Sequence, residues 1–243
     1  MRCLVIGDIH SNLAAFEAVL RDGEARGGFD GVWCLGDVVG YGPDPHECIQ
    51  LLRQFEPVCV AGNHDWAAIG RVDTADFNPV AAQACHWTAQ QLTPEDIDYL
   101  KKLPLELRQD DFTLVHGSPR EPVWEYLLSR EAARDNFACF ETTYCLVGHS
   151  HVPLVFELVG NSVVYKMFPD EASVKLGENR LFINPGGVGQ PRDGDPRASY
   201  AVYDADARTV YHYRVEYDIV TTQKRMKERG LPLPLIMRLS QGW

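Results

Sequence analysis

Short apolar runs recur through the first two thirds of the chain, and each ends at or near a residue type that binds metals. Five such runs occupy residues 3–8, 33–37, 58–63, 113–116 and 145–149. They show little alternation of apolar and polar residues, which is typical of central strands buried on both faces. Four cysteines within these runs are therefore interpreted as buried small hydrophobic residues: Cys3, Cys34, Cys59 and Cys145.

Helical patterns separate the early strands. Ser11 or Asn12 can cap a helix with an apolar stripe from Leu13 to Leu20, and this helix is expected to end near residues 27–28. A second helix opens at 44–45, and Pro57 closes it. The chain thus begins as a βαβαβ unit. From about residue 65 to 104 the pattern is helical, with helix starts at 78–79 and 93–94, which predicts a helical excursion beside the strand ends.

Strands dominate the second half. A hairpin is expected over 105–108 and 112–115, a helix from Ser129 to about residue 140, and a last helix over 219–229 before a Pro-Leu-Pro-Leu-Ile tail. Further strands are predicted at 154–159, 162–167, 181–183, 199–203 and 209–217. We find neither a repeat nor a linker. The pattern predicts an α/β sandwich of two packed mixed sheets flanked by helices, with residues 1–243 as one domain.

The charge balance narrows the choice of partners. The 243 residues carry a formal charge of −11, with no basic stripe, which argues against general nucleic-acid binding and against anionic membranes. The opening apolar run is too short for a signal peptide, and no run approaches the roughly 20 residues of a membrane span. A cytoplasmic protein is expected. If its substrate is an anion, bound metal is the obvious source of local positive charge.

Candidate metal ligands gather at the strand ends. Five of the eight histidines are among them. Imidazole and carboxylate together suit Mn, Fe, Zn, Co or Ni, and the number of candidates predicts a site for two divalent ions. Asp37, the lone carboxylate after the second strand, is the natural bridge between them. The full set of polar candidates is Asp8, His10, Asp37, Asn63, His64, His116, His149 and His151.

Counting ligands divides this set in two. Asp8, His10, Asp37 and one of the two last histidines would hold the first ion; Asp37, Asn63, His116 and the other would hold the second. Ligand types alone leave open which of His149 and His151 serves which ion.

Five motifs in order resemble the signature of the calcineurin-like metallophosphoesterases. They are Gly-Asp8-Ile-His10, Gly-Asp37, Gly-Asn63-His64-Asp65, His116-Gly and Gly-His149-Ser-His151, and they span residues 8–151. The stretch from Gly36 to Pro45 also resembles a small prokaryotic subgroup of that family. The resemblance implies the family's α/β sandwich. It assigns His151 to the first ion and His149 to the second, and it places His64 beside the metals as a catalytic residue.

The resemblance also implies a reaction. A hydroxide between the two ions would attack phosphorus, and His64 would donate a proton to the leaving oxygen or stabilise its charge. The expected substrate is a small-molecule phosphate ester or a nucleotide; monoesters, diesters and dinucleoside polyphosphates remain open. A similar site could also hydrolyse a different bond, and a non-catalytic scaffold for protein binding is a further alternative.

A protein phosphatase is disfavoured by the second motif. Gly40 and Tyr41 stand where that branch of the family carries Asp and Arg, which leaves the orienting partner of His64 open, with Asp65 as a weak candidate.

Other residues carry weaker signals. Arg192 and Arg197 lie in a polar Gly/Pro-rich loop over 184–197 that either is a simple turn or approaches substrate. The alternating tyrosines of 211–217 suit a half-buried edge or dimer-forming strand, compatible with a homo-oligomer. Three aromatic residues after the motifs could line a substrate pocket, although core or interface packing is favoured: Trp66, Trp124 and Tyr126. The remaining histidines are interpreted as surface or structural: His46, His86 and His212.

Overall fold

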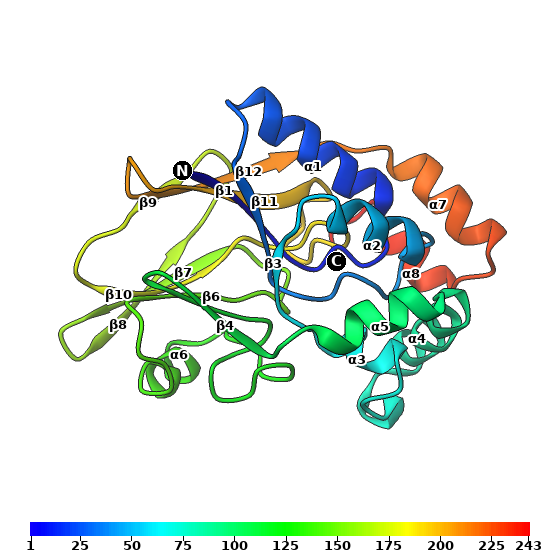
Figure 1. Ribbon diagram of the computed structural model, residues 1–243, viewed down its shortest axis with the longest axis horizontal. Coiled ribbons are helices and arrows are strands. Elements are labelled where there is room, and N and C mark those ends of the chain that lie inside the picture. The colour runs from blue at the N-terminus through cyan, green and yellow to red at the C-terminus, as the bar shows by residue number, and fades with distance from the viewer.

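The computed structural model describes residues 1–243, except for the side chain of Asp76. Its strands form two mixed six-stranded sheets with helices around them, which confirms the predicted α/β fold (Figure 1). The first sheet has the order β3-β2-β1-β11-β12-β9, with strands β1 Arg2–Ile6, β2 Gly31–Cys34, β3 Val58–Cys59, β9 Ser173–Lys175, β11 Ala198–Asp204 and β12 Thr209–Val215. The second has the order β4-β5-β6-β10-β7-β8, with strands β4 Glu106–Gln109, β5 Phe112–Val115, β6 Tyr144–Leu146, β7 Leu154–Val159, β8 Ser162–Met167 and β10 Arg180–Asn184.

Most of the helices gather at one end of the molecule, on the right in Figure 1, whereas α6 lies below the second sheet. The predicted excursion over 65–104 is confirmed as a run of helices from α3 to α5. The helices are α1 Leu13–Ala25, α2 Pro45–Arg53, α3 Asn63–Ala68, the 3-10 turn η1 Thr74–Asp76, α4 Pro79–Gln91, α5 Pro94–Lys102, α6 Arg130–Asn136, α7 Ile219–Glu228 and α8 Leu233–Arg238.

Three apolar layers hold the sheets and helices together. Strand β1 shows how: Leu4 and Ile6 pack with α1 and α2, while Cys3 and Val5 join the layer between the two sheets. Such two-sided burial explains why the strand sequences do not alternate. The outer face of the second sheet packs on α6 through Phe156, Phe182 and other residues. The four cysteines of these runs are buried and unbridged, as predicted.

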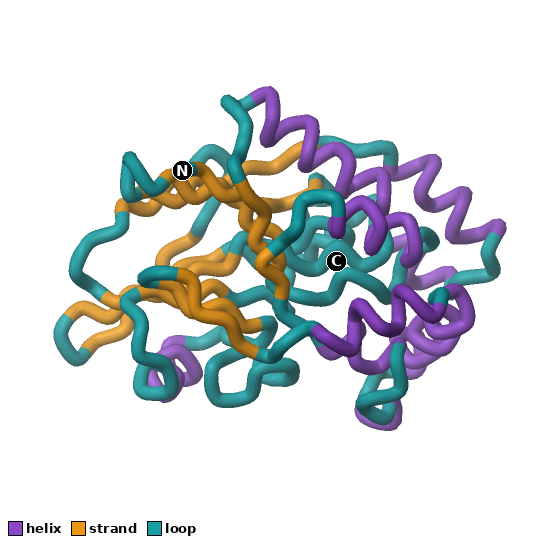
Figure 2. The backbone as a smooth tube through the Cα atoms, in the orientation of Figure 1, coloured by secondary structure: helices purple, strands orange, loops and turns teal.

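The strand directions decide where the connecting loops meet. Strands β1, β2 and β3 are parallel neighbours in the first sheet, and β5, β6 and β10 are parallel neighbours in the second. Ligands of open α/β sheets bind outside the carboxyl ends of such strands. In Figure 2 loops crowd the space between the strands and the helical end. The motif residues follow the ends of β1, β2, β3, β5 and β6.

The structure corrects several sequence predictions. Helix α6 ends at Asn136 instead of near residue 140, because Phe137 and Phe140 turn into the core. The tail forms α8: Pro232 caps it and Pro234 lies in its first turn, where proline is tolerated. Strand β9, three residues long, was missed. Since β9 pairs with β12, the tyrosine-rich β12 is not an edge strand.

Among the described helices, none has the length and apolar character needed to cross a membrane.

Candidate metal centre

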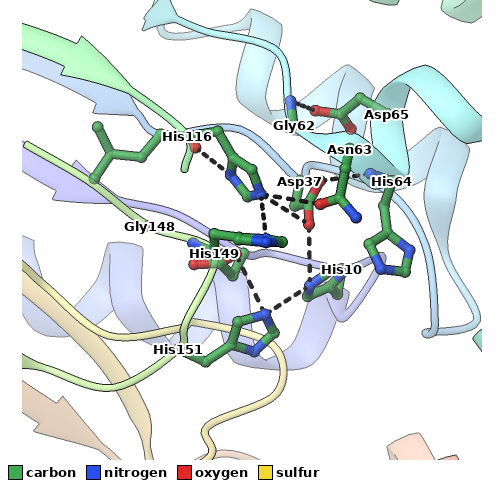
Figure 3. Close-up of polar contacts among 12 residues, drawn as sticks. His10, Asp37, Gly62, Asn63, His64, Asp65, His116, Gly148, His149 and His151 are labelled. Atoms are coloured by element: carbon green, nitrogen blue, oxygen red, sulfur yellow. Dashed lines mark hydrogen bonds and ion pairs between the residues drawn. The ribbon is translucent and has the colours of Figure 1, made fainter. Parts of the chain in front are cut away.

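The candidate ligands lie on sharp turns directly after the strands. Five have a positive φ: Asp8 (56°), His10 (49°), Asp37 (52°), His149 (63°) and His151 (57°). Residues other than glycine adopt this conformation at a cost of about 1–3 kcal/mol each, and such strain collects at functional sites. The fold therefore holds these backbones in costly turns that aim the side chains toward one point (Figure 3).

The first cluster consists of Asp8, His10 and His151, whose ligand atoms lie within 4.8 Å of one another. Nδ1 of His10 donates to the carbonyl oxygen of Val39 at 3.2 Å, and Nδ1 of His151 donates to that of Gln190 at 2.5 Å. A carbonyl oxygen only accepts, so these bonds fix the tautomer and leave both Nε2 atoms as lone-pair donors. The two Nε2 atoms face each other at 3.1 Å, an arrangement that a shared cation would stabilise.

The second cluster consists of Asp37, His116 and His149. Nδ1 of His116 donates to the carbonyl oxygen of Leu35 at 2.8 Å, and Nε2 of His149 donates to that of Trp124 at 3.2 Å. The other nitrogens of these two rings again face each other, 3.1 Å apart. Oδ1 of Asn63 lies 3.2 Å from Nε2 of His116 and adds an oxygen ligand to this group.

Asp37 joins the two clusters. Its Oδ1 accepts the backbone N–H of His64 at 2.8 Å. Its Oδ2 lies 3.6 Å from Nε2 of His10 in the first cluster and 3.3 Å from Nε2 of His116 in the second (Figure 3). Asp8 is held similarly, because its Oδ1 accepts the backbone N–H of His149. The Oδ2 atoms of both aspartates are buried without a hydrogen-bond partner among the described side chains.

Burial sets the charge of these groups. It lowers the pKa of His149 to about 3 and the pKa values of His10 and His151 well below the usual range, so these rings are neutral and can ligate. It raises the pKa of Asp8 to about 7. For His116 burial lowers the pKa, but the Asp37 carboxylate outweighs it and raises the value to about 9. The surroundings of Asp8 and Asp37 thus favour a positively charged group next to these two carboxylates.

These observations meet the requirements of two divalent metals. Buried carboxylate oxygens without partners are costly unless a cation or proton compensates them. The donor set mixes imidazole nitrogen with carboxylate and amide oxygen, which suits Mn, Fe or Zn and also Co or Ni. Backbone carbonyls orient all four rings, as the outer partners of metal-bound histidines do. The residues present therefore fit the metals that the sequence predicted.

His64 lies beside the clusters and lines the same cavity as Asn63 and His149. Its ring packs between Tyr41, at a centroid distance of 4.3 Å, and Phe77, at 5.0 Å. Its Nδ1 lies 3.2 Å from Sγ of Cys85 on α4. Burial lowers the pKa of His64 to about 4 and raises that of the Cys85 thiol, so both groups are uncharged at neutral pH.

The structure overturns Asp65 as the orienting partner of His64. Its two carboxylate oxygens accept the backbone N–H groups of Val39 and Gly62, at 3.1 and 3.0 Å, and so stabilise the start of α3. Cys85 takes the orienting position instead. Sequence reasoning missed Cys85 because its helical stretch carries no motif and lies 21 residues beyond His64.

Gly40 provides the space that His64 occupies. A Cβ atom at this position, where φ is +101°, would lie 2.7 Å from Nδ1 of His64. We expect Gly40→Ala to push the ring away from Cys85 and to lower metal-dependent turnover by about tenfold or more, because a side chain that acts on substrate must keep its position, while the metal content is unchanged. Steady-state kinetics and elemental analysis of the purified variant measure both quantities.

Gly70→Ala is the matched control, because Gly70 also has a positive φ, +72°, but a Cβ there would meet nothing within 4 Å. Both variants carry backbone strain, and only Gly40→Ala disturbs His64. Equal turnover in the two variants would contradict a positioning role for Gly40.

The two candidate arginines have different surroundings. Arg192 is half-buried and lies near the candidate ligands, with its Nη2 3.4 Å from the Tyr41 hydroxyl. The pKa of His151 is lowered mainly by burial, and the positive charge of Arg192 is the second largest cause. Arg197 instead binds Asp170 and Asp195, both at 2.7 Å, and lines a separate cavity of about 390 Å³. Two carboxylates hold the Arg197 guanidinium, so its surroundings differ from those of Arg192, and a substrate contact for either arginine stays a prediction.

The aromatic candidates also divide. Trp66 packs against the core beside the first sheet, as the structural interpretation expected. Trp124 and Tyr126 are partly exposed and line the cavity next to His149. The three remaining histidines have structural contacts: His46 with Asp96, His86 with Thr74 and His212 with Ser199.

Parallel strands that deliver two clusters of buried carboxylates and imidazoles are typical of metal-dependent hydrolases. Comparison with known proteins specifies its family. The family model for the calcineurin-like phosphoesterase superfamily domain matches residues 1–208. The chain belongs to this superfamily, which confirms the sequence resemblance and makes the protein a metal-dependent phosphoester hydrolase.

Individual proteins with similar sequences or structures can also be named. The crystal structure of a metallophosphoesterase from Sphaerobacter thermophilus is 48% identical, with a TM-score of 0.91 over 100% of this chain and 99% of that one. An uncharacterized protein of Methanocaldococcus jannaschii is 38% identical over 98% of this chain and 97% of its own length. A symmetrical bis(5'-nucleosyl)-tetraphosphatase of Vibrio cholerae is 26% identical over 54% of this chain, and the match spans about half of that enzyme, 49%.

Proposed function

We propose that this protein hydrolyses small-molecule phosphate esters, including nucleotides, with two divalent ions at the strand ends. The position of Asp37 Oδ2, between imidazoles of both clusters, carries the proposal. The first ion would be held by Asp8, His10, Asp37 and His151, and the second by Asp37, Asn63, His116 and His149. When bound, two such ions neutralise phosphoryl oxygens and lower the pKa of coordinated water.

The side chains around the metal ligands would handle the substrate. His64 lines the cavity at the second cluster, where the N–H of its uncharged ring can donate a hydrogen bond that stabilises charge on the leaving oxygen. Its contact with Cys85 fixes the ring for this role. Arg192 carries a buried Nε without a partner among the described side chains, which supports a role for it in binding a phosphate oxygen.

The nucleotide part of the proposal has support from a relative. The Vibrio cholerae protein is named for action on a bis(5'-nucleosyl) tetraphosphate, which contains nucleoside phosphate groups. Since this chain spans about half of that enzyme, we extend to it only the chemical class and not the particular substrate.

The proposal predicts metal-dependent turnover of aryl phosphates. The protein is treated with chelator, reloaded with Mn, Fe, Zn, Co or Ni, and assayed on p-nitrophenyl phosphate and bis(p-nitrophenyl) phosphate. We expect the reloaded enzyme to exceed the chelated one by more than about 10²-fold on at least one ester, because metal ions stabilise the transition state by several kcal/mol. Activity should rise until two ions per chain are bound.

The two esters separate monoesterase from diesterase action. Saturation at one ion per chain would contradict the dinuclear centre. Failure of every metal to support turnover of either ester would contradict the proposed function itself.

A further inference from the structure

We propose that the cavity beside the second cluster binds a nucleobase, which stacks on a wall formed by Phe77, Trp124 and Tyr126. This inference rests on the proposed function and names the substrate class of the same site: esters that carry one base near the scissile phosphate. We call these three residues the aromatic wall.

The aromatic wall is continuous with the metal centre. The ring of Tyr126 stacks on the ring of His149, with centroids 3.9 Å apart and an interplanar angle of 15°. Phe77 lies against His64 and meets Trp124 edge to face at 5.7 Å. A ring that enters the cavity would therefore lie against aromatic faces while its phosphate lies at the metal ligands.

Exposure argues that the wall serves a ligand. Trp124 is 37% exposed and Tyr126 is 46% exposed, although both are large aromatic side chains next to a deeply buried site. Core packing would have covered them, since an aromatic side chain gains stability from burial. Aromatic faces left open beside a phosphate site are the usual platform on which bases stack.

Hydrogen bonds and an ion pair of Glu125 anchor the segment that carries Trp124 and Tyr126. Between them, Glu125 accepts hydrogen bonds from Ser118 at 2.6 Å and from Asn136 at 2.8 Å, and it pairs with Arg120. These contacts hold the aromatic residues in place before a ligand arrives. A pre-organised platform loses little conformational entropy on binding.

The size of the cavity favours one base. Its volume is about 270 Å³, and its lining includes Asn63, His64 and His149 together with the aromatic wall. This is slightly below the roughly 300–1,000 Å³ of pockets that enclose whole drug-sized ligands. One ring system next to a phosphate fits these limits, whereas two nucleosides would not both be enclosed.

A competing explanation is that the aromatic wall only steadies His149. Tyr126, which stacks on that ring, cannot separate the two roles. Trp124 can, because its contact with His149 uses the backbone carbonyl, which a side-chain substitution keeps. Trp124→Ala should therefore leave the metal ligands in place and remove only the part of the aromatic wall that Trp124 provides.

The test compares two ligands that differ only in the base. The methylene phosphonate analogues of AMP and of ribose 5-phosphate resist hydrolysis, so isothermal titration of the Mn-loaded protein measures binding without turnover. We expect the AMP analogue to bind the unmodified protein about 5- to 150-fold more tightly, the range for one base stacked on aromatic side chains. In Trp124→Ala this preference should fall to within about threefold.

Trp243→Ala is the matched control, since Trp243 is a 62% exposed tryptophan at the chain end and should leave the preference unchanged. Equal affinities for the two analogues in the unmodified protein, including no measurable binding of either, would overturn the inference. An unchanged preference in Trp124→Ala would overturn it as well. Because the proposed function is tested by turnover of nitrophenyl esters, failure of one experiment is distinguishable from failure of the other.

Discussion

Asp37→Asn is expected to reduce metal-dependent turnover by more than about 10²-fold and to lower the metal content from two ions per chain to one or none. Changing an outer partner of a ligand already costs about 10–100-fold, and in the proposed site Asp37 would ligate both ions directly. Asparagine keeps an oxygen for the backbone N–H of His64 but presents a neutral amide at the point where Oδ2 faces both clusters.

Elemental analysis and kinetics with added Mn test this prediction together. Asp206→Asn is the control, because that carboxylate is 91% exposed and pairs only with the N-terminal amine among the described ion pairs. If Asp37→Asn bound two ions and kept its turnover, Asp37 could not be the bridging ligand.

His64→Ala should give the opposite combination: two ions per chain are retained, and turnover falls by about 10²–10⁴-fold, the usual contribution of a positioned acid or base. The ring lines the cavity, but neither cluster of ligand atoms includes it. Its backbone N–H, which binds Asp37, survives the substitution. The loss should therefore fall on chemistry and not on metal binding.

His86→Ala is the matched control, since it also removes an imidazole, from an exposed position one residue beyond Cys85. Full activity of His64→Ala would contradict a catalytic role. Loss of a metal ion would show that His64 is a ligand, which would revise the assignment of both clusters.

Local pattern was sufficient for most of the fold. The runs before Asp8, Asp37 and His149 could be recognised as strands because strands buried on both faces need several consecutive apolar residues. The sequence predictions failed for elements that form only because a distant part of the chain pairs with them or packs against them. Strand β9 exists because β12 offers it a hydrogen-bonding edge, and α8 exists because Leu235 and Ile236 pack against α4 and α7.

At the site, the surroundings of His64 show the same contrast between what a local motif predicts and what distant elements contribute. The motif Gly62-Asn63-His64-Asp65 made His64 a candidate, yet its neighbours come from elsewhere: Cys85 from α4, Phe77 from the turn before it, and Gly40 from the loop after β2. Asp65 was the natural partner in sequence but satisfies backbone N–H groups instead.

Residues close together in the chain were enough to predict the strand ends, the ligand types and, through the five motifs, the family. The motifs also suggested two groups of ligands, and the tertiary structure shows the contacts within each group. His10 and His151 face each other across 141 residues. They follow β1 of the first sheet and β6 of the second, so the packing of the two sheets brings them together. The tertiary structure also places Arg192 near His151 and pairs Arg197 with two carboxylates, and it leaves Trp124 and Tyr126 open to the cavity, since packing partners far along the chain set burial and charge.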